Sequence, residues 1–375
     1  MRLRSALGGG ALAFTAGFNV SNVGAVADRV AVSYGIGLAV VGLFTTGLFV
    51  THAALQVPMG RLSDRLGARL VGAAGLAIVA AASAAALGWK EAWFAIGMRV
   101  VAGVGTAACF VSGAEYTRAR IGSAVAQGVY GATSMAAGGL ALALVPLWNS
   151  WRAPFGSAAI VAAAGLVLLA LAPRAPAAQR RVLDELPTVV DRRLLPLAAM
   201  HSASFGLSVV IGNWVVPLLH RAGGEPVEVA GVAGALVLFL GVFSRPLGGR
   251  LVDRPALIRL SFVASAAGIA LLALARPLPL MVAASALVGL AAGIPFAPAF
   301  AGAQRLRPDA PAAAVGFVNM IAAATILVGT PLVGLTFSLP SDGRLGFLVV
   351  ACLCLSTAFV VRDVRGSAGT ADSGR

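Results

Sequence analysis

Long apolar stretches separated by short charged segments constrain this chain more than any other feature of its sequence. A helix that crosses a bilayer needs about 20 apolar residues, and the chain of 375 residues holds twelve such stretches between its charge clusters. Only 11% of the residues are charged, against roughly 25% in soluble domains. We therefore predict an all-α integral membrane protein. The approximate predicted spans are residues 5–27, 35–59, 70–89, 92–114, 124–147, 153–172, 194–219, 229–249, 257–275, 277–303, 312–337 and 345–361.

The basic residues predict the orientation of these spans. If the N-terminus is inside, 20 of the 28 Lys and Arg residues fall in inner segments and 6 in outer segments, while Arg99 and Arg245 lie within spans. Because cytoplasmic loops carry an excess of Lys and Arg, we expect a multi-pass protein of the plasma (inner) membrane with both termini in the cytoplasm. The net charge of +14 then reflects topology. No basic patch is interleaved with aromatic residues, so we expect no nucleic-acid partner.

A charged run between the second and third spans is repeated in the second half of the chain. Residues Gly60–Arg69 return as Gly249–Arg254, with five residues matching at an offset of 189. The segments Gly113–Glu115 and Gly302–Gln304 end the fourth and tenth spans at the same offset. The repeat predicts two related six-helix bundles. Their expected bounds are residues 1–172 and 194–362, with a cytoplasmic linker at 173–193 and a disordered cytoplasmic tail at 363–375.

The charged run resembles a known signature. Gly60, Asp64, Arg65, Gly67 and Arg69 resemble the loop 2–3 motif of the major facilitator superfamily, and the run from Arg99 to Gly105 resembles its fourth-helix motif, an arginine followed by closely spaced glycines. The resemblance extends from about residue 5 to 362. It implies two pseudo-symmetric six-helix bundles that face each other across a central cavity. Such a protein is a secondary transporter that rocks its bundles to open to each side in turn, and we expect it to work as a monomer in the lipid bilayer.

The resemblance also implies a gate on the cytoplasmic side. Gly60 and Gly67 permit a tight turn and close helix approach, and Asp64 can cap the third span or pair with an arginine. In the family, this aspartate contacts a helix of the opposite half when the cytoplasmic side is shut, and an acid that closes the fourth helix joins it, here Glu115. The alternative is that the arginines only fix topology. The predicted gating residues are Gly60, Asp64, Arg65, Gly67, Arg69, Glu115, Gly249, Asp253 and Arg254.

Two arginines in the middle of spans suggest the charge of the substrate. Ionisable residues inside a membrane cost roughly 2.5–3.5 kcal/mol on insertion scales and mark functional sites. Arg99 and Arg245 are such residues, and no Asp or Glu lies in the middle of a predicted span. If these arginines face the cavity, it is electropositive and favours a small inorganic anion or a carboxylate. His52 and His201 are the candidates for proton coupling, although a lone histidine in a helix is commonly a packed polar residue.

Arg245 carries a second, partial resemblance. Arg245–Gly249 and Gly212–Pro217 look similar to the nitrate/nitrite porter branch, in which each half offers a cavity arginine at this place; here the first half has Gln56 instead. The fifth span, with Gly138-Gly139, lacks the asparagine-and-glycine pattern of nitrate carriers. Other polar residues of the spans either line the cavity or bond neighbouring helices. The candidates for substrate contact are Gln56, Arg99, Arg245, Asn22, Tyr130, Asn213, Trp214 and Asn319, together with Asn19.

The sequence leaves two alternatives to an anion carrier open. They are proton-coupled multidrug efflux and a transporter-like sensor without net transport. The three cysteines lie inside spans, where thiols behave as small apolar groups, and no nucleophile or metal-ligand constellation is present. We therefore expect neither enzymatic activity nor a cofactor or metal.

Overall fold

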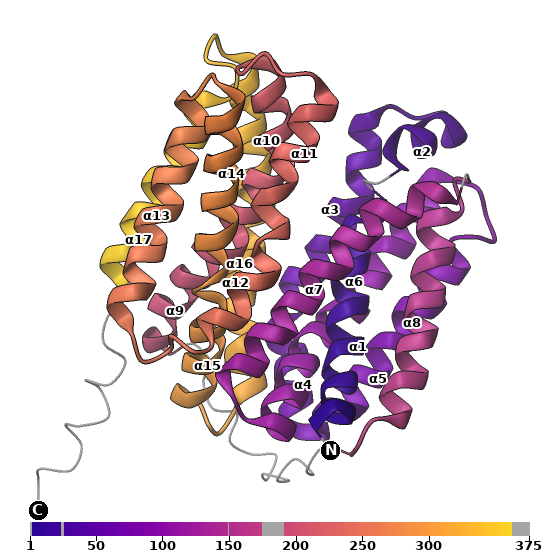
Figure 1. Ribbon diagram of the computed structural model, residues 1–375. Coiled ribbons are helices and arrows are strands. Elements are labelled where there is room, and N and C mark those ends of the chain that lie inside the picture. Colours follow the sequence, from indigo (N-terminus) through magenta and orange to yellow (C-terminus); the bar gives the residue numbers. More distant parts are fainter. Residues whose placement is uncertain (1, 24–25, 149, 175–190, 362–375) are drawn as a thin grey trace, which may run out of the picture.

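The protein consists of helices arranged in two bundles that stand side by side (Figure 1). The computed structural model describes all residues except 1, 24–25, 149, 175–190 and 362–375, and within that part every regular element is a helix. Most of the predicted linker and all of the tail at 363–375 lie outside the described residues. Each of the twelve predicted spans is occupied by helix, as an all-α membrane fold requires.

The first half of the chain builds one bundle. Its third, fourth and sixth spans are single helices, whereas the second is divided between two. The helices are α1 (Arg2–Ser21), α2 (Ala27–Tyr34), α3 (Leu38–Ala54), α4 (Gln56–Leu66), α5 (Ala68–Ala85), α6 (Ala92–Ile121), α7 (Ala124–Leu144) and α8 (Ala153–Leu171).

The second half builds the other bundle with more interruptions. Its first span contains a π-helical turn, and its second and fourth spans are each divided. The elements are α9 (Leu195–His201), η4 (Ser202–Gly206), α10 (Leu207–Arg221), α11 (Val227–Phe239), α12 (Gly241–Gly248), α13 (Pro255–Leu274), α14 (Leu278–Gly293), α15 (Phe296–Leu306), α16 (Pro311–Leu335) and α17 (Arg344–Val360).

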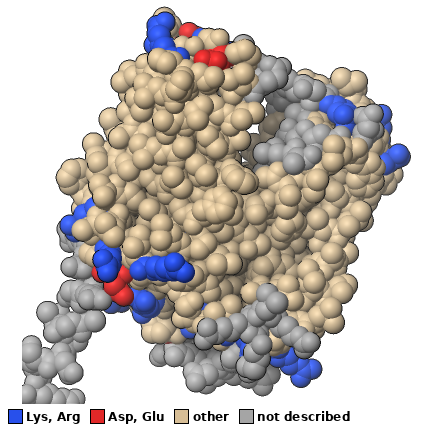
Figure 2. All heavy atoms as spheres, viewed as in Figure 1, with Lys and Arg blue, Asp and Glu red and all other residues tan. Residues whose placement is uncertain are grey.

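Length and composition identify membrane spans among these helices. Seven described helices are long and apolar enough to cross a bilayer, and the pair α3 and α4, bent by 52°, makes an eighth if it is one span. Three further apolar helices are shorter. In Figure 2 the Lys, Arg, Asp and Glu side chains gather at the two ends of the molecule and leave an uncharged belt between them. This distribution fits a protein whose middle is covered by lipid.

The charged run Gly60–Arg69, which the sequence places between two spans, is largely helical. Its first part is the last two turns of α4, and the chain turns only at Gly67, whose φ of 91° favours glycine. Gly60 therefore does not serve the turn. It lets two helices meet, because a Cβ at Gly60 would lie 2.6 Å from backbone atoms of Ala312 and Ala313.

The duplication is visible in how each bundle closes. Arg69 at the start of α5 donates to the carbonyls of Ala172 and Ala170 at the end of α8, at 2.7 and 2.9 Å. Arg259 near the start of α13 donates to the carbonyl of Val361 after α17, at 2.7 and 2.9 Å. Ala172 and Val361 are 189 residues apart, the offset of the sequence repeat, and the two arginines are 190 apart, one position out of that register. These bonds satisfy carbonyls that a helix end leaves without partners.

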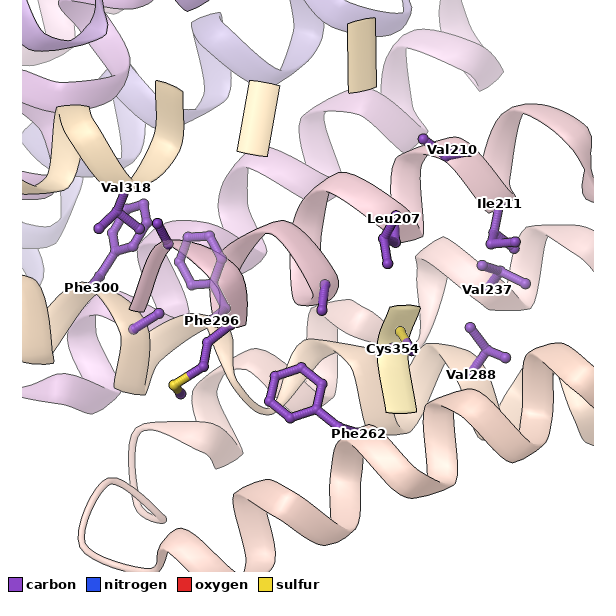
Figure 3. Close-up of a cluster of buried hydrophobic side chains, with 14 of the residues drawn as sticks. Leu207, Val210, Ile211, Val237, Phe262, Val288, Phe296, Phe300, Val318 and Cys354 are labelled. Carbon is purple, nitrogen blue, oxygen red and sulfur yellow. The ribbon is translucent and has the colours of Figure 1, made fainter. Parts of the chain in front are cut away.

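Buried apolar side chains fill both bundles and continue between them. In the second bundle, Phe262, Val288 and Cys354 lie together, with Phe296 and Phe300 closer to the first bundle (Figure 3). The two halves meet mainly where α4 lies against α16 and α7 lies against α12. We call the end that holds the α4–α5 turn and the start of α16 the hinge end; the chain also begins there (Figure 1). Figure 2 shows the surface hollowed between the halves at the opposite end.

Candidate functional site

The hinge end contains a direct bond between the two halves. Asp64 Oδ1 accepts the backbone N–H of Ala312 and Oδ2 that of Ala313, both at 2.9 Å. These N–H groups belong to the first turn of α16, whose own N-cap residue, Ala310, supplies no side-chain bond. Asp64 therefore caps a helix of the opposite half and places its negative charge at the positive end of that helix. The third span, which the sequence also offers as its partner, begins at Gly67 without a side-chain cap.

An ion pair fixes the loop before this helix. Arg307 Nη2 lies 2.7 Å from Asp309 Oδ2, and the bond to the carboxylate raises the pKa of the guanidinium. On the other side of the contact, Glu115 bonds Arg118 through both oxygens, at 2.6 and 2.7 Å. The charges of Glu115 and Arg118 also act on Asp64. Glu115 thus lies near Asp64, although it bonds an arginine of its own helix.

The second copy of the run shares its glycine contact and differs elsewhere. A Cβ at Gly249 would lie 2.4 Å from backbone atoms of Val125 at the start of α7, just as Gly60 meets the start of α16. Asp253 and Arg254, by contrast, are exposed, as is Arg65 in the first copy. The predicted gating residues therefore differ in structure: Gly60, Asp64 and Gly249 touch the opposite half, Arg65, Asp253 and Arg254 are exposed, and Gly67, Arg69 and Glu115 serve the turn or bond within the first bundle.

Arg99 bonds entirely within the first bundle. Its side chain is 2% exposed and donates to the backbone carbonyls of Phe44 and Asn19, at 3.2 and 2.6 Å, and to Asn19 Oδ1 at 3.2 Å. These contacts join α1, α3 and α6. The guanidinium is therefore occupied by its own bundle.

Other polar residues predicted for the first half also bond within their bundle. Asn22 Nδ2 donates to the carbonyl of Pro154 at 2.8 Å, and Tyr130 donates to the carbonyl of Phe110. His52 Nδ1 lies 3.0 Å from Thr106 Oγ1. Such bonds between helices are the alternative that the sequence offers for these side chains.

Arg245 lies at the junction of the two halves. It is 2% exposed, and its Nη1 donates to the carbonyl of Gly131 in α7, at 2.8 Å. The guanidinium carbon lies 4.3 Å from the ring centre of Phe296 and 5.6 Å from that of Phe205, within reach of cation–π attraction. Its Nε has no partner, and no carboxylate of the described residues forms an ion pair with it.

His201 contacts the same two rings, and Asn319 bonds His201. The His201 ring centre is 5.3 Å from that of Phe296 and 5.4 Å from that of Phe205. His201 Nε2 and Asn319 Oδ1 are 3.0 Å apart. Because an amide oxygen only accepts, Nε2 carries the proton and Nδ1 of the neutral ring is an acceptor. Neither His201 Nδ1 nor Asn319 Nδ2 has a partner, and both residues are 0% exposed.

The last three predicted residues occupy different places. Gln56 is 0% exposed, both polar atoms of its amide lack partners, and its backbone touches Gly316 of α16. Asn213 and Trp214 bond Thr330 of α16, at 3.4 Å to the hydroxyl and 2.8 Å to the carbonyl. Gln56 thus lies between the halves, as Arg245 does, while Asn213 and Trp214 join helices of the second bundle.

The sequence analysis did not predict the phenylalanine side chains that line this site. Phe205, Phe296 and Phe300 surround His201, and Phe296 also packs on Gly131, where a Cβ would lie 2.2 Å from its ring. Figure 3 shows Phe296 and Phe300 together below Val318. Phe296 and Phe300 are four residues apart, a spacing that places both on one helix face. That spacing is the only sign of the pair in the sequence, and it is not distinctive, because 59% of the residues are hydrophobic.

A known protein family matches most of the chain. The profile of the Major Facilitator Superfamily matches residues 10–330. The chain belongs to the major facilitator superfamily. Its members are multi-pass membrane transporters, and the predicted fold class and membrane nature of the chain are confirmed. No curated protein matches the chain.

Solved structures agree with this membership at low identity. The human organic anion transporter MFSD10 (TETRAN) is 16% identical, with a TM-score of 0.74 over 96% of this chain and 99% of that one. The proton:xylose symporter XylE, bound to 6-bromo-6-deoxy-D-glucose, is 13% identical, with a TM-score of 0.74 over 95% and 94%. The E. coli fucose:proton symporter FucP is 13% identical, with a TM-score of 0.71 over 95% and 97%. At these identities the likeness shows the shared fold alone.

Proposed function

We propose that this transporter carries a small anion or organic acid by alternating access. The observation that carries the proposal is Arg245, a buried guanidinium at the junction of the halves that no described carboxylate neutralises. A buried charge is costly unless an opposite charge compensates it. An anionic substrate supplies that compensation each time it binds.

The contacts between the halves support a two-state cycle. In this structure they meet at the hinge end, through Asp64 and the start of α16, and the opposite end is hollowed between them (Figure 2). We infer that the hinge end faces the cytoplasm of a cell whose plasma (inner) membrane holds the protein, with both termini inside, since the basic residues are concentrated there. Gly60, Asp64 and Gly249 then form the gate, which opens when the substrate is released to that side.

The organic anion named for MFSD10 accords with a positive site, whereas XylE and FucP are named for neutral sugars. Nitrate, which the partial resemblance to the nitrate/nitrite porter branch suggests, is one of the small anions to be tested. Multidrug efflux and a sensor without net transport are the competing outcomes. We propose no enzymatic activity; no group of three His, Cys, Asp or Glu side chains that could hold a metal gathers among the described residues.

Flux into proteoliposomes tests the proposal. The purified chain is reconstituted and offered radiolabelled nitrate, lactate and propionate and a cationic dye, with and without a pH gradient. We expect uptake of at least one anion and its loss in Arg245→Ala. Arg221→Ala, which removes an exposed arginine from the opposite end, is the matched control and should transport normally. Dye transport that persists in Arg245→Ala, without anion flux in the unaltered chain, would contradict the proposal.

A further inference from the structure

Three polar side chains of the second half that gather around the phenyl rings have buried atoms without partners. Arg245 Nε, Asn319 Nδ2 and His201 Nδ1 are these atoms, and each residue is at most 2% exposed. In the first half, Arg99 and His52 are bonded to neighbours in their own bundle, whereas the Gln56 amide is also unpaired. Because buried polar groups are normally hydrogen-bonded, the three atoms beside the rings indicate a missing partner there.

The three atoms belong to one cluster. Arg245 and His201 both contact the same two rings, Phe205 and Phe296, and Asn319 bonds His201 directly. They come from α12, α9 and α16, so a single ligand that meets all three also ties three helices together. Phe300, whose ring centre lies 4.8 Å from that of His201, completes an apolar wall.

The chemistry of the three atoms selects the ligand. Arg245 Nε and Asn319 Nδ2 are donors, and a carboxylate accepts from both. His201 Nδ1 is an acceptor, because Nε2 holds the proton toward Asn319 Oδ1. The ligand must therefore combine an anionic acceptor with a neighbouring donor.

We propose that the second half binds a small hydroxy-carboxylate, with its carboxylate on Arg245 and Asn319, its hydroxyl on His201 Nδ1 and its carbon atoms against the phenyl rings. This inference rests on the proposed function and narrows its substrate class. Nitrate has acceptors but no donor, so it leaves His201 Nδ1 without a partner. An amino acid brings an ammonium beside the Arg245 guanidinium, where no described carboxylate forms an ion pair. A neutral sugar leaves the guanidinium charge uncompensated.

Binding of matched acid pairs to the full-length chain in nanodiscs tests this assignment. The pairs are lactate against propionate and glycolate against acetate, each differing by one hydroxyl, with nitrate as the inorganic anion. We expect each hydroxy acid to bind about tenfold more tightly than its deoxy partner, the effect of one well-made hydrogen bond. Nitrate should bind more weakly than lactate. Equal affinity within both pairs in the unaltered chain, or nitrate binding as tightly as lactate, overturns the assignment without any variant.

A variant locates the hydroxyl. His201→Leu should lose the preference for lactate while its affinity for propionate changes less than threefold. His52→Leu is the matched control, because His52 Nδ1 already faces Thr106, and it should keep the preference. A preference that survives in His201→Leu places the hydroxyl elsewhere and refutes the role of His201. If anions bind without regard to the hydroxyl, only this inference fails; if no anion binds and none is transported, the proposed function fails as well.

Discussion

Replacing Asp64 with asparagine should weaken the closed hinge end without removing the protein from the membrane. The carboxylate now accepts two N–H groups of α16, at Ala312 and Ala313, and lies at the positive end of that helix. Asparagine keeps one acceptor oxygen and loses the charge. One charge-assisted bond and the charge–dipole attraction are therefore lost in the closed state alone.

The size of the effect follows from these two losses. A hydrogen bond to a charged group contributes about 1.5–3 kcal/mol, and a charge at an accessible helix end contributes about 0.3–1 kcal/mol. Since the asparagine retains part of the cap, we expect a loss of about 2–3 kcal/mol in the closed state. The ratio of closed to open hinge ends should then fall by about 30- to 150-fold, and the transport rate should fall with it.

Distance measurements between spin labels can detect this shift. Labels at Leu66→Cys in α4 and Arg305→Cys in α15 report on the hinge end from both halves, because both side chains are exposed. Cys352, the exposed native cysteine, is first replaced by Ser. Asp64→Asn should populate longer distances, whereas Asp342→Asn, which changes an exposed aspartate at the opposite end, should change the distribution little. An unchanged distribution in Asp64→Asn, or an equal change in both variants, would refute the reasoning.

Two further substitutions test a contact between the bundles and a set of bonds within the first bundle. Gly128→Ala should keep α7 and α12 apart and lower transport at least tenfold, because its Cβ would lie 2.3 Å from the backbone oxygen of Arg245; Gly139→Ala on the same helix, with nothing within 4 Å, should be neutral in the same proteoliposome assay. Arg99→Ala should lower the free energy of unfolding by about 2–4 kcal/mol, since three bonds from a buried guanidinium are lost; thermal denaturation in detergent measures it, and an unchanged midpoint would contradict a structural role for Arg99.

The helical fold was predictable because membrane insertion leaves a simple record in the sequence. Every backbone polar group must be bonded inside the apolar layer, so long uncharged stretches become helices. The interruptions were not predictable to the same degree. The bend of 52° between Ala54 and Gln56 lies where Pro58 cannot donate to the carbonyl of Ala54, a signal that the length of the apolar stretch hides. The π-helical turn at Ser202–Gly206 lies inside a stretch that is long enough for one continuous span. The sequence also predicts that the second span ends at about residue 59, because charged residues follow; α4 in fact continues through them to Leu66.

The sequence predicted which residue types form the site, but not which groups each side chain would bond. Arg99 and Arg245 look alike in the sequence, since each is a lone charge within a span. The structure separates them: Arg99 finds three oxygens in its own bundle, and Arg245 reaches one carbonyl of the other bundle and keeps Nε unpaired. The difference depends on which helix face each arginine occupies and on what packs there, and neither is encoded within one span. Phe205 and Phe296, whose rings lie beside Arg245, were not predicted for the same reason.

The two halves of the chain keep matching residues at the hinge end and differ at the centre of the molecule. Gly60 and Gly249 must both allow a helix of the opposite half to approach, so the same residue is kept at both places. Four residues earlier the copies are Gln56 and Arg245, and there the two halves need not match if, as we propose, the ligand is held by the second half. Replacing Arg245 with glutamine, the residue of the other copy, should therefore remove anion binding while leaving the hinge end closed.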